Sequence, residues 1–278
     1  MWIAAAFATM ICFGMNNSIF KWSTGKGLSK IHIQFIFYLV AFLIMVAYGI
    51  IHGLEKMNLL TIVLGAIIGI LNANGNIQMS KAFEKGPASL TSPLIGTNAI
   101  VPILSAGLIF HEHITIFQWL GIIIMLGSAM VIQYSPTTNS GFHYLPWLIR
   151  VMMAFISFGV LGILMKTSSF FHLQSINILI SMYGGGCLYL AVNSILDKNK
   201  WVKTEINVGT LVGIISILGY SAYFYALKIG ISSIVFPVVS LNCLVVILAG
   251  CWIFKEKLKL YQVIGICSAL LGIVFTKI

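Results

Sequence analysis

Residues 82–121 read AFEKGPASLTSPLIGTNAIVPILSAGLIFHEHITIFQWLG, and residues 226–265 read ALKIGISSIVFPVVSLNCLVVILAGCWIFKEKLKLYQVIG. The two stretches lie 144 positions apart, and most of their small and polar landmarks coincide at that spacing. The coinciding pairs are Ala82 with Ala226, Gly86 with Gly230, Ser89 with Ser233, Pro93 with Pro237, Asn98 with Asn242, Glu112 with Glu256, Gln118 with Gln262 and Gly121 with Gly265. Apolar matches would arise from composition alone, but matches of this kind indicate an internal repeat.

The repeat continues toward the start of the chain. Gly65, Gly69 and Gly75 fall on Gly209, Gly213 and Gly219 at the same spacing, and Phe13, Gly14, Lys21 and Tyr38 fall on Phe158, Gly159, Lys166 and Tyr183 at a spacing of 145. The sequence therefore predicts two homologous halves, residues 1–134 and 144–278. Residues 135–143 form a polar linker between them.

Composition places this repeat in a membrane. Hydrophobic residues make up 59% of the 278 positions, charged residues only 8%, and the mean hydropathy is +1.02. A soluble protein carries about 25% charged residues. Ten apolar runs are each about as long as a membrane-spanning helix: 1–20, 31–52, 59–80, 87–110, 115–133, 145–165, 173–196, 206–227, 232–254 and 259–276. We expect an all-α integral membrane protein with ten transmembrane helices.

Each half has five of these runs, an odd number, so two copies in series cross the membrane in opposite senses. This is an inverted repeat, a common plan for secondary transporters. Of the 16 basic residues, twelve fall in the odd-numbered loops and four on the opposite side. The positive-inside rule then places both termini outside a plasma (inner) membrane. The basic residues are scattered over short loops, so the net charge of +10 does not indicate nucleic-acid binding.

Catalytic and metal-binding patterns are missing from the sequence. The carboxylates lie at helix ends or in loops, with Glu84 the least certain, and the five cysteines form no C-x-x-C pair. The segment His111-Glu112-His113 lacks the i, i+4 histidine spacing of a helical metal site and is better explained as a loop. We therefore expect no enzyme, metal or cofactor, and transport driven by gradients, because no ATP-binding motif occurs.

Polar stripes in the third and eighth runs are candidates for lining a wet cavity. At helical spacing they comprise Gly65, Gly69, Asn72 and Asn76 in the third run, and Gly209, Gly213, Ser216, Tyr220 and Tyr223 in the eighth. The alternative is close packing with interhelical hydrogen bonds. The adjacent Asn16 and Asn17 in the first run are costly against lipid, so at least one should face the protein interior.

Prolines at repeat-equivalent positions of two predicted helices are further candidates for the transport site. Pro93 and Pro237 occupy equivalent positions and would each remove a helical hydrogen bond, with Asn98 and Asn242 five residues later. Such paired breaks mark transport sites, although a purely structural kink is the alternative. Lys21 and Lys166 are also equivalent, and are interpreted either as gating or anion contacts or as snorkelling lysines.

These features together resemble the drug/metabolite transporter superfamily in its ten-helix, EamA-like form. The resemblance is carried by Phe13-Gly14 with Lys21, by Ala82-x-x-x-Gly86-x-x-Ser89 leading to Pro93, by Phe110-x-Glu112 and Gln118-x-x-Gly121, and by the echoes Phe254-x-Glu256 and Gln262-x-x-Gly265. It covers the whole chain and implies alternating access through a central cavity lined by the first, third, fourth, sixth, eighth and ninth helices. It also implies cytoplasmic termini, the opposite of the charge pattern.

The expected function is gradient-driven transport of a small neutral or zwitterionic metabolite, such as an amino acid. The predicted substrate-binding residues are Asn16, Asn17, Asn72, Asn76, Asn98, Tyr220, Tyr223 and Asn242, and the predicted gating or hinge residues are Lys21, Lys166, Pro93 and Pro237. The expected partners are this substrate and the lipid bilayer, with the chain acting as a monomer. The alternatives are a lipid-linked-sugar flippase, a sugar carrier and a non-transporting membrane scaffold.

The orientation of the chain in the membrane can be tested directly. If the lysine asymmetry governs insertion, cysteines introduced at Lys200 and Lys257 should react with an impermeant thiol reagent only after cells are permeabilised. Labelling of intact cells would show that the charge pattern does not set the topology.

Overall fold

The computed structural model describes residues 1–53, 57–86, 88–134, 144–196, 201–253 and 259–276. The predicted linker at 135–143 lies outside the described residues, as do Lys200 and Lys257. All regular secondary structure within the described ranges is helical. The all-α fold class expected from the sequence is therefore confirmed.

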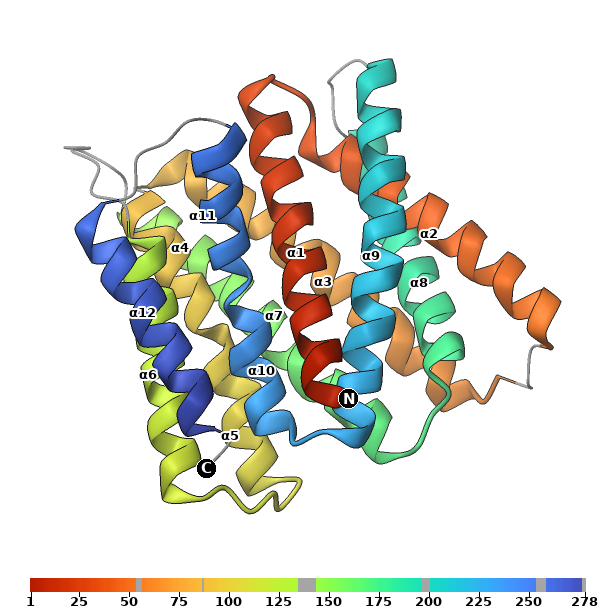
Figure 1. The fold of residues 1–278 in the computed structure, drawn as a ribbon. Coiled ribbons are helices and arrows are strands. Elements are labelled where there is room, and N and C mark those ends of the chain that lie inside the picture. The colour runs from red at the N-terminus through yellow and green to blue at the C-terminus, as the bar shows by residue number, and fades with distance from the viewer. Residues whose placement is uncertain (54–56, 87, 135–143, 197–200, 254–258, 277–278) are drawn as a thin grey trace. The chain divides into compact units, whose positions relative to one another are not determined.

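Figure 1 labels the helices along the chain. They are α1 (Trp2–Gly25), α2 (Lys30–His52), α3 (Leu59–Lys85), α4 (Ala88–Gly96), the short 3₁₀ helix η1 (Thr97–Ala99), α5 (Ile100–Leu108), α6 (Ile116–Gln133), α7 (Tyr144–Phe170), α8 (Ser175–Leu196), α9 (Lys203–Ile229), α10 (Ser232–Ser240), α11 (Asn242–Ile253) and α12 (Leu260–Phe275). Across the described residues, nine helical stretches are long and apolar enough to cross a membrane, and α12 is a shorter apolar helix. This agrees with the ten predicted runs.

Several helices are longer than the apolar runs that predicted them. The helix α1 continues to Gly25 and α3 to Lys85, each about one turn beyond the expected end. The helices α7 and α9 are longer than their runs in the same way. A run of apolar residues in the sequence ends near the first charged residue. The helix itself continues into the polar interface of the membrane, where lysine side chains reach water.

The two proline-containing spans are each divided into two helices. Pro93 lies inside α4 and Pro237 inside α10. The regular helix gives way only later, at η1 in the first case and at Leu241 in the second. Each proline removes one backbone donor, but the break itself follows three or more residues downstream.

The contacts of the chain divide it into two compact units. The first unit comprises residues 1–73 and 164–228, and the second comprises residues 74–163 and 229–278. Their boundaries fall within α3 and α7 and at the end of α9. Each unit therefore combines helices from both sequence halves, because helices that are equivalent in the repeat pack against one another.

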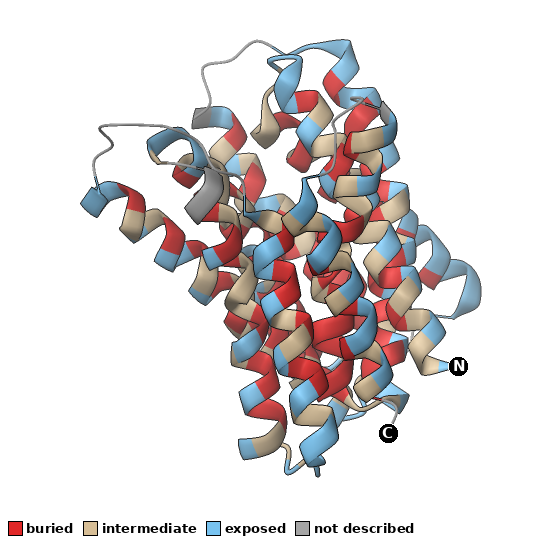
Figure 2. Ribbon diagram, turned by 60° about the vertical axis from the view of Figure 1, so that its left-hand side comes forward, coloured by how far each residue is buried: buried red, intermediate tan, exposed pale blue. Residues whose placement is uncertain are grey.

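In the first unit, α2 and α3 pack closely against α8. A Cβ atom added at Gly69 would lie 1.9 Å from the Met182 carbonyl oxygen, and one added at Gly186 would lie 2.1 Å from the Tyr38 ring. Figure 2 shows buried and exposed positions alternating around individual helices. The glycines mark the positions where the backbones approach too closely for a side chain.

In the second unit, α6 and its repeat equivalent α12 run side by side (Figure 1). A Cβ at Gly121 would lie 2.6 Å from the Gly272 carbonyl oxygen, and a Cβ at Gly265 would lie 3.4 Å from the Ser128 carbonyl oxygen. Gly121 corresponds to Gly265 and Ser128 to Gly272 at the 144-residue spacing. The two contacts are therefore the same contact repeated.

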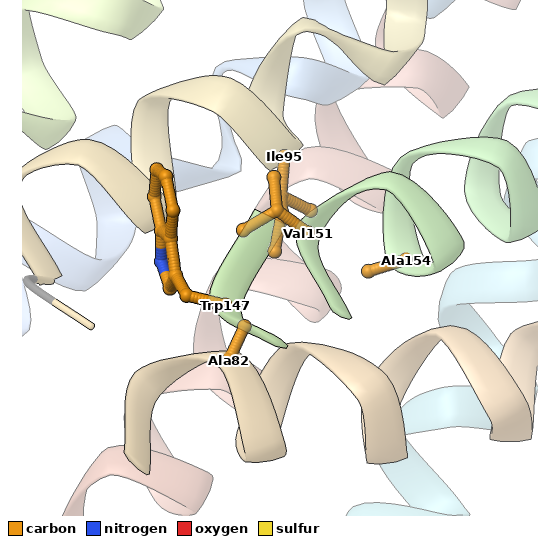
Figure 3. Packing of buried hydrophobic residues seen from close by; sticks show 5 residues of the cluster. All are labelled: Ala82, Ile95, Trp147, Val151 and Ala154. Carbon is orange, nitrogen blue, oxygen red and sulfur yellow. The ribbon is translucent and has the colours of Figure 1, made fainter. Parts of the chain in front are cut away.

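Where α3, α4 and α7 meet, the second unit has a small apolar core. Ala82, Ile95, Trp147, Val151 and Ala154 are buried together there (Figure 3). The Trp147 indole N–H donates to the Thr91 hydroxyl at 2.8 Å, which fixes the start of α7 against α4.

The α6–α12 contact predicts different effects for two glycines of the same helix. Gly121→Ala would place a methyl group against the Gly272 carbonyl, and overpacking against backbone typically costs 1–3 kcal/mol. Gly127 has no atom near its missing Cβ, so Gly127→Ala should be neutral or slightly stabilising. Thermal unfolding in detergent compares the two variants, and equal changes would contradict this assignment.

Candidate functional site

The interior of the first unit contains four tyrosines that we call the tyrosine cluster: Tyr38, Tyr183, Tyr220 and Tyr223. All four are buried. The Tyr38 and Tyr183 rings meet edge to face with centroids 5.9 Å apart, and the Tyr183 and Tyr220 rings do so at 6.3 Å. Phe13 of α1 packs on Tyr220 at 4.8 Å and on Tyr223 at 5.8 Å.

Hydrogen bonds tie the tyrosine cluster to α3 and α9. The Asn72 amide donates to the Tyr38 hydroxyl at 2.7 Å. The Tyr183 hydroxyl lies 3.2 Å from the Ser216 hydroxyl. Tyr38 and Tyr183 are repeat equivalents, and so are Asn72 and Ser216. The same tyrosine contact is thus made once in each half, between neighbouring helices.

The glycines of the two predicted stripes lie at helix contacts. A Cβ at Gly65 would lie 2.5 Å from the Ser181 Cβ atom, and one at Gly209 would lie 2.8 Å from the Ile33 carbonyl oxygen. The polar residues beyond them, Asn72 and Ser216, take part in the hydrogen bonds just described. At these positions the stripes therefore provide close packing as well as polar contacts.

Asn16 and Gln34 present polar atoms that the fold does not satisfy. Asn16 is only 8% exposed, and its side-chain oxygen has no hydrogen-bond partner among the described residues. Gln34 of α2 is fully buried, and both of its amide atoms lack a partner in the same ranges. Asn17 is exposed. The expectation that one of the two adjacent asparagines faces inward is confirmed.

In the second unit, Asn98 and Asn242 each bond back to the helix that precedes the break. The Asn98 amide donates to the Ile95 carbonyl at 2.6 Å, and the Asn242 amide donates to the Val239 carbonyl at 3.0 Å. Both bonds bridge the helix breaks that follow Pro93 and Pro237. The two asparagines thus satisfy carbonyls at equivalent interruptions, and their role in substrate binding stays a prediction.

The remaining predicted residues are placed as follows. Lys21 lies one turn before the end of α1 and is exposed, and Lys166 lies one turn before the end of α7 and is partly buried. Asn76 is a partly buried residue of α3. Of the predicted substrate-binding residues, the first unit contains Tyr220 and Tyr223 packed on Phe13, and Asn72 bonded to Tyr38 of the tyrosine cluster.

An ionisable pair that the sequence analysis missed closes one end of the first unit. Glu205, in the first turn of α9, accepts from the Ser29 backbone N–H at 2.8 Å and lies 3.0 Å from His32 Nδ1. The two side chains are 2% and 0% exposed. Trp201 stacks on the His32 ring at 4.0 Å. Glu205 was recognised only as a helix-end carboxylate, and nothing in the local sequence connected it to His32.

A second contact missed from the sequence involves Glu112, in the loop before α6. One carboxylate oxygen accepts from the Ser232 N–H at 3.1 Å and from the Ser232 hydroxyl, and the other accepts from the Ser233 N–H and hydroxyl, each at 3.0 Å. Ser232 and Ser233 begin α10. The positive end of a helix dipole favours such an anion. The repeat match of Glu112 with Glu256 was the available signal.

Comparison with known proteins places these features in a family. The EamA-like transporter family matches residues 1–134 and 145–278. The chain belongs to the EamA-like transporter family. The resemblance stated from the sequence motifs is confirmed, and this EamA-like chain is a multi-pass membrane transporter.

Two curated proteins are similar in sequence to this EamA-like chain. One is a probable 4-amino-4-deoxy-L-arabinose-phosphoundecaprenol flippase subunit, ArnE, of Proteus mirabilis, which is 35% identical over 106 residues, covering 37% of this chain and 93% of that protein. The other is an uncharacterized protein of Haemophilus influenzae, 22% identical over 211 residues and covering 74% and 72% of the two chains. One crystal structure matches 98% of both chains with a TM-score of 0.77 at 13% identity, which shows a shared fold.

The contact of Glu112 with α10 predicts a measurable contribution to the stability of this EamA-like chain. Glu112→Gln removes the charge and one pair of acceptor bonds, and hydrogen bonds to charged groups contribute about 1.5–3 kcal/mol each. We expect a clearly lower unfolding temperature in detergent. Glu84→Gln, at an exposed position, is the matched control and should change little. Equal effects of the two substitutions would show that the Glu112 contact does not stabilise the folded state.

Proposed function

We propose that this chain is a gradient-driven carrier of small neutral or zwitterionic metabolites, with amino-acid-like molecules the favoured class, and that it works by alternating access. The observation that carries the proposal is the uncharged polar interior of the first unit. Hydroxyl and amide groups of Tyr38, Asn72, Tyr220 and Ser216 are buried there without a charged neighbour among them. Such groups suit a ligand without net charge.

The unsatisfied oxygen of Asn16 supports the same conclusion. A buried acceptor without a partner costs about 1–3 kcal/mol, and an N–H, O–H or ammonium group of a ligand would satisfy it. Gln34 offers a second amide with both a donor and an acceptor. Neutral donors and acceptors together match the amino and carboxyl groups of a zwitterion. We further propose a plasma (inner) membrane location and a monomer that needs no protein partner.

The absence of an ATP-binding motif from the sequence supports the proposed energy coupling through gradients. The described carboxylates Glu84, Glu112 and Glu205 lie at helix ends or in loops, so none sits in the middle of a span to carry a proton. We therefore propose transport that does not require a buried mid-membrane carboxylate.

A lipid-linked-sugar flippase is the second candidate, favoured by one observation. The relative from Proteus mirabilis is described as a flippase subunit for an aminosugar linked to phosphoundecaprenol. Its likeness covers 37% of this chain. A flippase would bind a lipid-linked sugar and ignore water-soluble amino acids, so a single ligand panel separates the two candidates.

The test begins with a thermal-shift screen of the purified protein against amino acids, sugars and lipid-linked sugars. For any hit, Tyr220→Phe and Asn16→Leu, both in the first unit, should weaken binding about two- to twelvefold, the equivalent of about 0.5–1.5 kcal/mol for one lost hydrogen bond, without unfolding the protein. Tyr225→Phe is the matched control, because Tyr225 is an exposed tyrosine of the same helix.

Uptake of the hit into proteoliposomes with and without an imposed gradient then tests the coupling. Normal binding by both site variants would show that the polar residues serve packing alone. Stabilisation by lipid-linked sugars and not by water-soluble metabolites would replace the carrier proposal with the flippase.

A further inference from the structure

A groove in the second unit lies where the end of α3 meets the start of α7. It encloses about 300 Å³ and is lined by Lys85, Leu145, Pro146, Ile149, Arg150 and Met153. Its two polar lining residues are both cations, and the other four are apolar. Lys85 ends α3, so the groove lies near the ends of two membrane-spanning helices.

The two cations lack an acidic counterpart within the groove. Among the described residues, neither Lys85 nor Arg150 forms an ion pair, and no carboxylate lines the groove. Glu84 precedes Lys85 in sequence but is exposed and does not belong to the lining. Two positive charges that line the same largely apolar groove favour an anion.

Arg150 is held in place by a chain of hydrogen bonds. Its guanidinium donates to the Gln78 side-chain oxygen at 2.7 Å, and the Gln78 amide donates to the Asn74 oxygen at 3.0 Å. The Asn74 amide in turn donates to the Ser157 hydroxyl at 3.0 Å. The bond to Gln78 uses one of the five N–H donors of the guanidinium, a group whose planar fork suits phosphate.

The apolar lining follows one face of α7. Leu145, Ile149 and Met153 are spaced four residues apart, and all three are exposed. They extend over roughly 12 Å of helix at 1.5 Å per residue. The opposite face of α7 carries Trp147, Val151 and Ala154, which are packed into the apolar core of the second unit (Figure 3). The groove therefore lies on the outer face of a firmly packed helix.

From this arrangement we propose that the groove binds the phosphate headgroup of an anionic membrane lipid, with Lys85 and Arg150 contacting the phosphate and an acyl chain following Leu145, Ile149 and Met153. A free phosphate ion would gain nothing from the apolar lining. A zwitterionic headgroup would bring its ammonium group toward two cations that have no carboxylate beside them. Basic pockets between membrane helices bind anionic lipids on the same principle. This site is separate from the proposed transport of metabolites and is tested without a transport assay.

Native mass spectrometry of the detergent-purified full chain measures the binding of added phosphatidylglycerol. Each basic residue at such a site contributes about a fivefold change in affinity. Lys85→Gln and Arg150→Gln should each weaken phosphatidylglycerol binding by about that factor. Lys26→Gln is the matched control, because Lys26 is an exposed lysine at the end of α1, outside the groove. It should leave the affinity unchanged.

Phosphatidylcholine and inorganic phosphate form the other arms of the experiment. Phosphatidylcholine should bind more weakly than phosphatidylglycerol and should not distinguish the variants, and inorganic phosphate should not displace the lipid. The proposal is overturned if both lipids bind equally, if Lys26→Gln weakens binding as much as Lys85→Gln, or if inorganic phosphate competes. Lys85→Gln keeps the test decisive if Arg150→Gln disturbs folding, because Lys85 takes no part in the hydrogen-bond chain that includes Gln78.

Discussion

The close approach of helix backbones at glycine is the constraint on which both units depend. In a bilayer, burying apolar side chains gives little driving force between helices, because the lipid is equally apolar. Association of the helices must therefore come from close packing of their surfaces and from contacts between polar groups. Gly69 lies against the Met182 carbonyl in the first unit, and Gly121 lies against the Gly272 carbonyl in the second. Both contacts join helices from different halves of the repeat. Each unit is therefore held together by close contacts between the two sequence halves.

Polar side chains provide the second kind of contact between the helices. A polar group facing hydrocarbon needs a partner within the protein, and the tyrosine cluster meets this need symmetrically. Tyr38 is bonded by Asn72, and its equivalent Tyr183 is bonded by Ser216. The equivalent positions differ, because the second half has the Ser216 hydroxyl where the first half has the Asn72 amide. The two halves thus place different polar groups against equivalent tyrosines, so the duplicated scaffold has a chemically asymmetric interior in the first unit.

Much of the fold could be predicted from the sequence, but less of the site. The apolar runs and the 144-residue spacing indicated ten membrane helices, because length and repetition are properties of the chain itself. The site depends on which helix each side chain meets. Asn98 and Asn242 were interpreted as ligand contacts, yet a spacing pattern cannot show that they bond to carbonyls at helix breaks. The pairing of His32 with Glu205 joins residues 173 positions apart and leaves no local signal.

The positions of the charged side chains, like the packing of the helices, follow from the low polarity of the bilayer. The two carboxylates with the most described hydrogen bonds, Glu112 and Glu205, both lie at helix N-termini, where backbone N–H groups and the helix dipole favour an anion. A charge at the end of a membrane-spanning helix is less costly than a charge at the bilayer centre. Glu112 fastens the loop before α6 to α10, and Glu205 fastens the start of α2 to α9. Charge therefore secures the helix ends, and neutral polar groups occupy the interior of the first unit.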